Sequence, residues 1–327
     1  MKPILWLMAA ALGLAAQPKL LVNSKVDARS AAAGLEQTLR PLIAAQPQPA
    51  WIGYSVPSTR AGLGCDYVRD GWGQPGVIHL EPPDHAVILF RVEESRLMRI
   101  RSLSPECEID AGDLPVHWLN DVNAAESVAL LEGFAKGRER YMDSAMNALA
   151  AHGDPAASVA LERLMAPSQP ESIRLRVVSL IGNMRGRSGF EVLKKIAVDD
   201  ANERVRERAV QTLGNSREAD TIDVLAERAR KDPEPRIRMA AISALSRHPG
   251  SKVLGTLGEA IEQDADAQVK RRAVSSLTSM PDGEGVPMLI QLAKAAREEP
   301  VKKQAMSSLG QSRDGRAVAF FEEVLKK

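Results

Sequence analysis

Residues 205–213 read Val-Arg-Glu-Arg-Ala-Val-Gln-Thr-Leu, and Val205, Ala209 and Leu213 stand four residues apart in this stretch. Residues at i, i+4 and i+8 lie on one side of a helix, so the stretch predicts a helix with a single apolar stripe. The small alanine in the middle of the stripe leaves room for a neighbouring backbone to approach. The pattern therefore predicts a helix that packs closely against other helices.

The same stripe recurs every 32 residues, without an insertion, from residue 141 onward. Its columns are Tyr141, Ile173, Val205, Ile237, Val269 and Val301; Ala145, Val177, Ala209, Ala241, Ala273 and Ala305; and Leu149, Ile181, Leu213, Leu245, Leu277 and Leu309. A further column marks a second helix in each unit: Leu161, Leu193, Leu225, Leu257, Leu289 and Phe321. One helix pair cannot bury both of its apolar faces, but stacked pairs can. The sequence therefore predicts a mainly α fold, with an α-solenoid of six helix pairs over residues 139–327.

Three glycines, Gly182, Gly214 and Gly310, come directly after the stripe of a first helix. Helices often end at a glycine that adopts the left-handed backbone conformation. We therefore expect these glycines to end the first helices of their pairs.

The columns resemble HEAT repeats, and the short period with the pattern Val-Arg-x-Arg-Ala-Val-x-x-Leu is similar to the compact HEAT-like repeats of phycobilin lyases. The resemblance covers about residues 139–327. The Trp, Gly and Tyr signature of tetratricopeptide repeats and the Thr-Pro-Leu-His of ankyrin repeats are both missing. The resemblance implies a surface that holds a protein partner. It also suggests an alternative, a lyase that acts on tetrapyrrole adducts.

Charged residues follow the repeat as well, and acids stand six residues before three of the repeated bases. In HEAT families such acids and bases form a ladder between repeats. The resemblance implies these pairs: Asp200 with Arg206, Asp232 with Arg238, and Asp264 with Lys270. Ser168 and Ala296 interrupt the acidic column, so we expect the ladder to be incomplete near both ends. The basic column could instead be a ridge that grips an acidic partner.

The N-terminal residues 1–16 have the features of a secretory signal peptide. Lys2 supplies a positive charge, an apolar stretch runs from Ile4 to Leu12, and small residues follow. The apolar stretch is too short to span roughly 30 Å of hydrocarbon, and no cysteine follows it for lipid attachment, so we expect no stable membrane anchor. The expected location is periplasmic or secreted.

Residues 17–122 lack the repeat. Residues 26–46 show apolar positions near helical spacing, and prolines follow, so residues 17–50 are predicted to hold one helix and a Pro-rich linker. The runs at 86–92 and 97–103 predict a hairpin within a small β-rich (α+β) module over residues 51–122. Asn123 and Glu126 have capping-box spacing, so residues 123–138 are predicted to form a helix that covers the open end of the solenoid.

The two cysteines, Cys65 and Cys107, both belong to the N-terminal part. An even number of cysteines in an exported protein favours one disulfide between them. Two separate buried thiols are the alternative, because cysteine is also common in protein cores.

The sequence offers no pattern for catalysis, for a metal or for a cofactor. Its five histidines stand singly, without the spacing of a metal site. HEAT-fold iron hydroxylases carry repeated His-Glu pairs, and no histidine here precedes a glutamate, so that enzyme class is excluded. Trp72, at the tip of a Gly-rich loop, is a candidate contact for a small ligand, with simple packing as the alternative.

The charged residues nearly balance, with 43 basic and 42 acidic side chains, so no overall charge attracts nucleic acid. The groove of a HEAT array usually comes from the second helices, where one row grades from basic to acidic: Arg163, Lys194, Lys195, Glu227, Glu259, Gln291 and Glu323. This gradient favours a protein or peptide partner. A solvated helix face explains the row equally well. The sequence thus predicts an exported, non-enzymatic scaffold or adaptor, with a lyase or a small-ligand-binding protein as the alternative.

Overall fold

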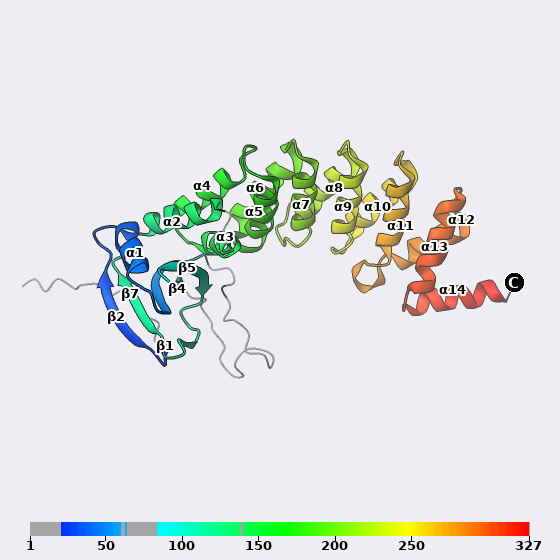
Figure 1. The fold of residues 1–327 in the computed structure, drawn as a ribbon. Helices are drawn as coiled ribbons and strands as arrows, with labels where there is room; N and C mark the ends of the chain where they lie inside the picture. Colours follow the sequence, from blue (N-terminus) through cyan, green and yellow to red (C-terminus); the bar gives the residue numbers. More distant parts are fainter. Residues whose placement is uncertain (1–20, 60–62, 64–83, 138–139, 327) are drawn as a thin grey trace, which may run out of the picture. The chain divides into compact units, whose positions relative to one another are not determined.

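A computed structural model describes residues 21–59, 63, 84–137 and 140–326 (Figure 1). The predicted signal peptide, Cys65 and Trp72 lie outside the described residues. The chain divides into two compact units, Met1–Leu164 and Met165–Lys327.

The first unit contains a five-stranded sheet with the strand order β2-β7-β3-β4-β5. Strand β7 is parallel to both of its neighbours, β2 and β3, whereas β4 is antiparallel to both of its neighbours, β3 and β5. A second, two-stranded sheet pairs β1 with β6. The strands are β1 (Leu21–Val22), β2 (Lys25–Ser30), β3 (Ala50–Pro57), β4 (His85–Glu93), β5 (Arg96–Leu103), β6 (Ile109–Asp110) and β7 (Pro115–Asn120).

The predicted hairpin is confirmed, because β4 and β5 are adjacent antiparallel strands. Glu94 and Ser95 make the turn with φ angles of 52° and 58°. A positive φ at both central residues suits the turn to the twist of the two strands. The sequence was therefore sufficient to place this part of the sheet.

The single helix predicted from residue 26 is wrong at its start. Lys25–Ser30 forms the edge strand β2, and only Leu35–Ala44 is helical, as α1. All six side chains of β2 are exposed, so packing of side chains does not determine this segment. Its backbone pairs with β7, which lies far away in the sequence, and this pairing overrides the local pattern.

Helix α2 (Ala124–Lys136) begins where the sequence predicts it, and the side chain of Asn123 accepts hydrogen bonds from the backbone N–H groups of Ala125 and Glu126. Phe134 of α2 packs on Phe90 of β4, with 6.1 Å between ring centroids. On its other side α2 contacts α3 (Met142–Ala151) and α4 (Pro155–Leu164), the first helix pair of the array. The first unit extends to Leu164 and so includes this first helix pair. The domain boundary at residue 138 stays a prediction.

The second unit consists of the other five helix pairs. Its helices are α5 (Glu171–Met184), α6 (Gly186–Asp199), α7 (Glu203–Leu213), α8 (Thr221–Lys231), α9 (Pro235–Leu245), α10 (Ser251–Gln263), α11 (Ala267–Leu277), α12 (Val286–Ala295), α13 (Glu299–Gln311) and α14 (Gly315–Leu325), with a short 3-10 turn, η1, at Pro281–Gly283. Consecutive first helices, α5, α7, α9, α11 and α13, contact one another. The second helices form the other layer, in which α6 contacts α8 and α8 contacts α10. The structure thus confirms a mainly α fold, with an α-solenoid after a small α+β module.

The apolar columns form the core of the array. Ala209, Leu213, Leu225 and Leu245 have no exposed surface, and Val205 is almost fully buried. Burial of a leucine side chain contributes roughly 1.5–3 kcal/mol. Stacking of equivalent helices therefore holds the solenoid together.

The predicted glycine caps are confirmed at one position only. Gly214 ends α7 as its C-cap residue, but with a right-handed φ of −59° in place of the left-handed conformation. Gly182 and Gly310 lie inside α5 and α13, so there the prediction is wrong. A Cβ atom at Gly182 would meet Thr212 of α7 and, at 2.8 Å, Leu193 of α6. A Cβ atom at Gly214 would lie 2.7 Å from the Cβ of Ala244 on α9. These two glycines allow neighbouring helices to approach closely, whereas Gly310 has open space around it.

Candidate functional site

The predicted charge ladder exists, but its register differs from the prediction. Asp200, Asp232 and Asp264 each stand directly after a second helix, as the C-cap residues of α6, α8 and α10. Each carboxylate accepts a hydrogen bond from the backbone N–H two residues further on, at 2.8–3.1 Å. This local bond fixes the carboxylate at the start of the next first helix.

The predicted pairs Asp200–Arg206, Asp232–Arg238 and Asp264–Lys270 are therefore corrected. The carboxylate of Asp200 pairs with Arg174, and that of Asp264 receives two bonds of 2.8 and 2.9 Å from Arg238, in each case an arginine of the preceding first helix. Arg206 instead donates to the backbone carbonyl of Asp200 at 2.7 Å, as Arg238 does to that of Asp232 at 3.0 Å. Asp200 and Asp232 thus each join two repeats, through the carboxylate to one and through the carbonyl to the next. After Asp264 the base of the next repeat, Lys270, reaches the carbonyl of Glu262 instead, at 3.5 Å.

The ladder continues past Ala296 in an altered form. Lys270 bonds to Glu298, two residues beyond the missing aspartate, at 2.5 Å. The side chain of Glu298 is half exposed, whereas the ladder aspartates are buried or nearly so. A glutamate near the equivalent place therefore supplies the charge that the acidic column lacks.

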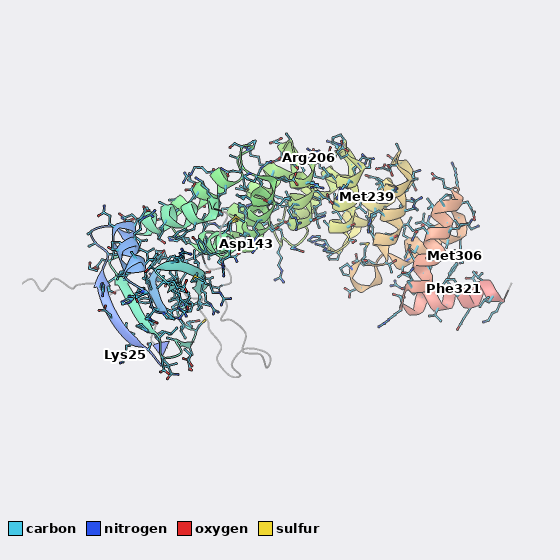
Figure 2. All side chains as sticks on the ribbon, viewed as in Figure 1. Lys25, Asp143, Arg206, Met239, Met306 and Phe321 are labelled. Carbon is cyan, nitrogen blue, oxygen red and sulfur yellow. The ribbon has the colours of Figure 1, made fainter. Side chains whose placement is uncertain are left out.

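The three aspartates of the ladder are buried or nearly so, and arginines lie beside each of them. The side chain of Asp232 is 1% exposed, and its Oδ2 atom lies 3.8 Å from a nitrogen of Arg206 on α7 and 3.8 Å from a nitrogen of Arg228 on α8. Arg206 is labelled in Figure 2. Burial alone would raise the pKa of Asp264, but hydrogen bonds from Arg238 and from the backbone of Asp266 outweigh it, so the pKa is lowered. Because the arginines of the ladder are largely buried against these acids, they are not available as a ridge for a partner.

Several charges of the predicted partner-binding row are paired with neighbouring helices. Arg163 donates to Glu132 of α2 through two nitrogens, at 2.9 and 2.5 Å. Glu259 pairs with Arg230 of α8, and Glu323 pairs with Lys294 of α12. Glu227 lies 3.5 Å from Lys231 of its own helix. Lys195 and Gln291 are exposed and Lys194 is half-buried. The row therefore contributes mainly to contacts within the array.

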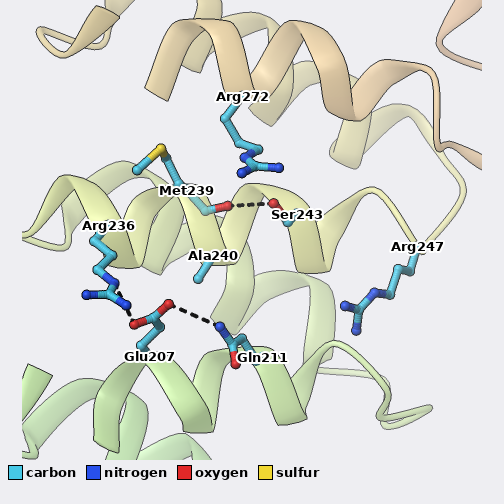
Figure 3. A pocket seen from close by; sticks show the side chains of 8 residues that line it. All are labelled: Glu207, Gln211, Arg236, Met239, Ala240, Ser243, Arg247 and Arg272. Carbon is cyan, nitrogen blue, oxygen red and sulfur yellow. Dashed lines mark hydrogen bonds and ion pairs between the residues drawn. The ribbon is translucent and has the colours of Figure 1, made fainter. Parts of the chain in front are cut away.

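A hollow lies on the other layer, along the first helices. Its larger part, of about 390 Å³, lies over α7, α9 and α11. Figure 3 shows the side chains that line this part. A smaller part, of about 300 Å³, lies over α5, α7 and α9. The two parts share Glu207, Gln211 and Arg236, and we call them together the trough. The residues that line the trough are Leu175, Arg204, Glu207, Arg208, Gln211, Arg236, Met239, Ala240, Ser243, Arg247 and Arg272.

The trough is strongly basic, with five arginines against one glutamate. Glu207 is held by Arg236 at 2.9 Å and by Gln211 at 3.1 Å, and its side chain is 18% exposed. Arg204 pairs with Glu171, whose pKa is lowered by the hydrogen bonds from Asn202 and Arg204. Arg208 and Arg272 are exposed and form no ion pair with any residue that the structure describes.

The sequence contained a signal for the trough that the prediction overlooked. Arg208 and Arg272 stand in one column of the repeat, with Ala240 between them, and Arg204 and Arg236 stand in another. These columns belong to first helices, whereas the prediction placed the groove on the second helices. Only the packing of the two layers shows which one is hollowed.

Comparison with protein families finds HEAT repeats over residues 158–246 and 254–327. This part of the chain is a HEAT-repeat array. A search of curated proteins gives no match. Among solved structures, the CpcE–CpcF complex of phycocyanin lyase from Nostoc sp. PCC7120 matches 46% of this chain and 97% of that chain, at 20% identity and a TM-score of 0.37. Human deoxyhypusine hydroxylase matches 58% of this chain and 80% of that chain, at 14% identity and a TM-score of 0.32.

Three further observations concern the other sequence predictions. Over the residues described, no three or more histidine, cysteine, aspartate or glutamate side chains gather as a metal site would require. None of the described helices has the length and apolar character needed to cross a bilayer. Cys107 is 3% exposed in a core cluster with Trp118 and Leu89, and its pairing with Cys65 stays a prediction because Cys65 is outside the described residues.

Proposed function

We propose that this protein is an exported, non-enzymatic scaffold that binds a protein partner in the trough of its HEAT-repeat array. The observation that carries the proposal is the contrast between paired and unpaired charges. The ladder and much of the second-helix row pair internally, whereas Arg208 and Arg272 are exposed beside a hollow. A cluster of exposed guanidinium groups makes a positive surface, and such a surface attracts a partner that carries negative charge.

The composition of the trough supports a protein partner. Arginine and methionine are enriched in protein interfaces, and the trough combines five arginines with Met239, Leu175 and Ala240. Its open shape and its length over several repeats fit an extended ligand surface better than an enclosed small-molecule site.

Charge reversal tests the proposal. The full chain, immobilised, is presented with the exported protein fraction, and the saturable partner is identified by mass spectrometry. Arg208→Glu together with Arg272→Glu should abolish its capture. The matched control reverses Arg217 and Arg313, two exposed arginines between helices and outside the trough, and should leave capture intact. Equal capture by the wild type and the trough variant would refute the assignment.

The proposed export rests on the N-terminal pattern of residues 1–16. Expression with a C-terminal tag should give a mature protein that starts near residue 17, outside the cytoplasm. Retention of the intact N-terminus inside the cell would refute this part.

The lyase alternative predicts binding of a bilin. Titration of the chain with a free bilin should leave the absorbance spectrum of the pigment unchanged if the protein is a scaffold. A saturable spectral change would favour the lyase.

A further inference from the structure

We propose that the trough binds a short acidic segment in the polyproline II conformation, with a carboxylate at every third residue. This inference rests on the proposed function and specifies the chemistry of the partner. It follows from the spacing of the arginines, from the gap between them and from the single acid of the trough.

The arginines of the trough repeat with the helices. α7 provides Arg204 and Arg208, α9 provides Arg236, and α11 provides Arg272. Packed helices lie roughly 8–10 Å apart, so Arg208, Arg236 and Arg272 come from helices spaced at about this interval. Arg236 stands one helical turn before the column of the other two and also holds Glu207. A polyproline II helix has three residues per turn and rises by roughly 9 Å in a turn. Carboxylates at i, i+3 and i+6 of such a segment therefore lie on one side and match successive repeats.

The middle repeat provides room for the segment. Ala240 stands in the column where the flanking repeats have Arg208 and Arg272, and the larger hollow opens over it, beside Met239 and Ser243 (Figure 3). Ser243 donates to the backbone carbonyl of Met239 at 2.9 Å, so its hydroxyl proton is already used. The floor is thus small and partly apolar, which suits the prolines or other apolar residues between the acids.

The one acid of the trough argues against a nucleic acid. Glu207 lies at the junction of the two hollows, where it is held by Arg236 and Gln211. A nucleic acid carries a charge at every nucleotide, and one that follows the trough would place phosphates beside this carboxylate. A peptide with spaced acids can place a neutral residue there instead. Charge complementarity therefore favours an acidic peptide segment.

Two peptides of equal composition test the spacing. Gly-Glu-Pro-Pro-Glu-Pro-Pro-Glu-Gly has its acids three residues apart, and Gly-Pro-Pro-Glu-Glu-Glu-Pro-Pro-Gly has them adjacent. Each carries a fluorophore and is titrated with the full chain in an anisotropy assay at low salt, where exposed charges are least screened. We expect the spaced peptide to bind at least about tenfold more tightly than the clustered one.

Variants and competitors separate the outcomes. Arg208→Gln with Arg272→Gln should remove the preference for the spaced peptide, whereas Arg217→Gln with Arg313→Gln should preserve it. Ala240→Leu should weaken binding of the spaced peptide, because the larger side chain fills the hollow without changing its charge. Equal affinity for the two peptides, or stronger binding of a single-stranded oligonucleotide than of either, would overturn the inference. The capture of a protein partner that depends on Arg208 and Arg272 would still support the proposed function in that case.

Discussion

Arg206 and Arg208 lie two residues apart on α7, yet their surroundings differ completely. Arg206 is 11% exposed and lies between repeats, bonded to the carbonyl of Asp200 and near the carboxylate of Asp232. Arg208 is exposed in the trough and has no acidic partner among the described residues. One helix thus has a packed side, which stabilises the array, and a trough side, which is available to a partner. The role of a charged residue in this solenoid follows from its side of the helix.

Removal of an acid from the packed side should have the largest effect on stability. Asp232→Ala leaves Arg206 and Arg228 buried without their carboxylate, and loss of one partner from a buried ion pair costs about 3–5 kcal/mol. Urea unfolding of the full chain, followed by circular dichroism, should show this loss. Glu262→Ala on the exposed surface of α10 is the control and should change stability by less than about 0.5 kcal/mol. Equal effects of the two changes would remove the distinction between buried and exposed charges.

A methyl group added between packed helices should have the next largest effect. Gly182→Ala brings a Cβ atom against Thr212 and Leu193 and should destabilise the chain by about 1–3 kcal/mol. Gly310→Ala faces open space inside α13 and should stabilise it by up to about 1 kcal/mol, because alanine favours a helix. Opposite shifts in the thermal midpoint are expected. Shifts of the same sign would contradict the assignment of packed and open sides.

Acid should weaken the contact between α2 and α4 in the first unit. The hydrogen bond from Arg163, opposed by burial and aided by Lys136, lowers the pKa of Glu132 to about 2 from its usual 4.5. The stabilisation that the ionised Glu132 carboxylate provides is therefore complete above pH 4.5 and is lost as the pH falls toward 2. Since Arg163 and Lys136 are about half exposed, we expect protonation of Glu132 to lower the free energy of unfolding by only about 1–2 kcal/mol. Glu132→Gln should flatten the dependence of unfolding on pH in this range, and an unchanged profile would refute this role of Glu132.

Truncation on the trough side should have the smallest effect on stability. Arg208→Ala and Arg272→Ala remove exposed side chains without a described acidic partner, so each should change the free energy of unfolding by less than about 0.5 kcal/mol. The same variants should weaken binding of the partner, and the loss should be greatest at low salt. A loss of stability above 1 kcal/mol would show that these arginines belong to the packing of the array.

Much of the fold could be predicted from the sequence, because the repeat is a local pattern. Val205, Ala209 and Leu213 lie on one side of a helix wherever that helix is placed, and the 32-residue period requires equivalent neighbours. The β4–β5 hairpin is likewise local. The strand at Lys25–Ser30 could not be found in this way, because it forms only by pairing with β7.

The site was harder to predict than the fold. The spacing of Asp264 allows pairing with Lys270 or with Arg238, and the choice depends on the bond from the N–H of Asp266 that orients the carboxylate. The trough depends on which helix layer is hollowed, which the columns of Arg204 and Arg208 do not reveal by themselves. Residue types were therefore informative about charge, whereas three-dimensional packing assigned each charge to a neighbour or to solvent.

Site-specific photocrosslinking tests the central claim most directly. A photoreactive amino acid is placed at Ser243, in the trough, or at Lys195, on the exposed face of α6, and the full chain is irradiated with the exported fraction. The account predicts a crosslinked partner from position 243 and none from position 195. A partner crosslinked from position 195 but not from position 243 would contradict the account and would return the binding surface to the second helices.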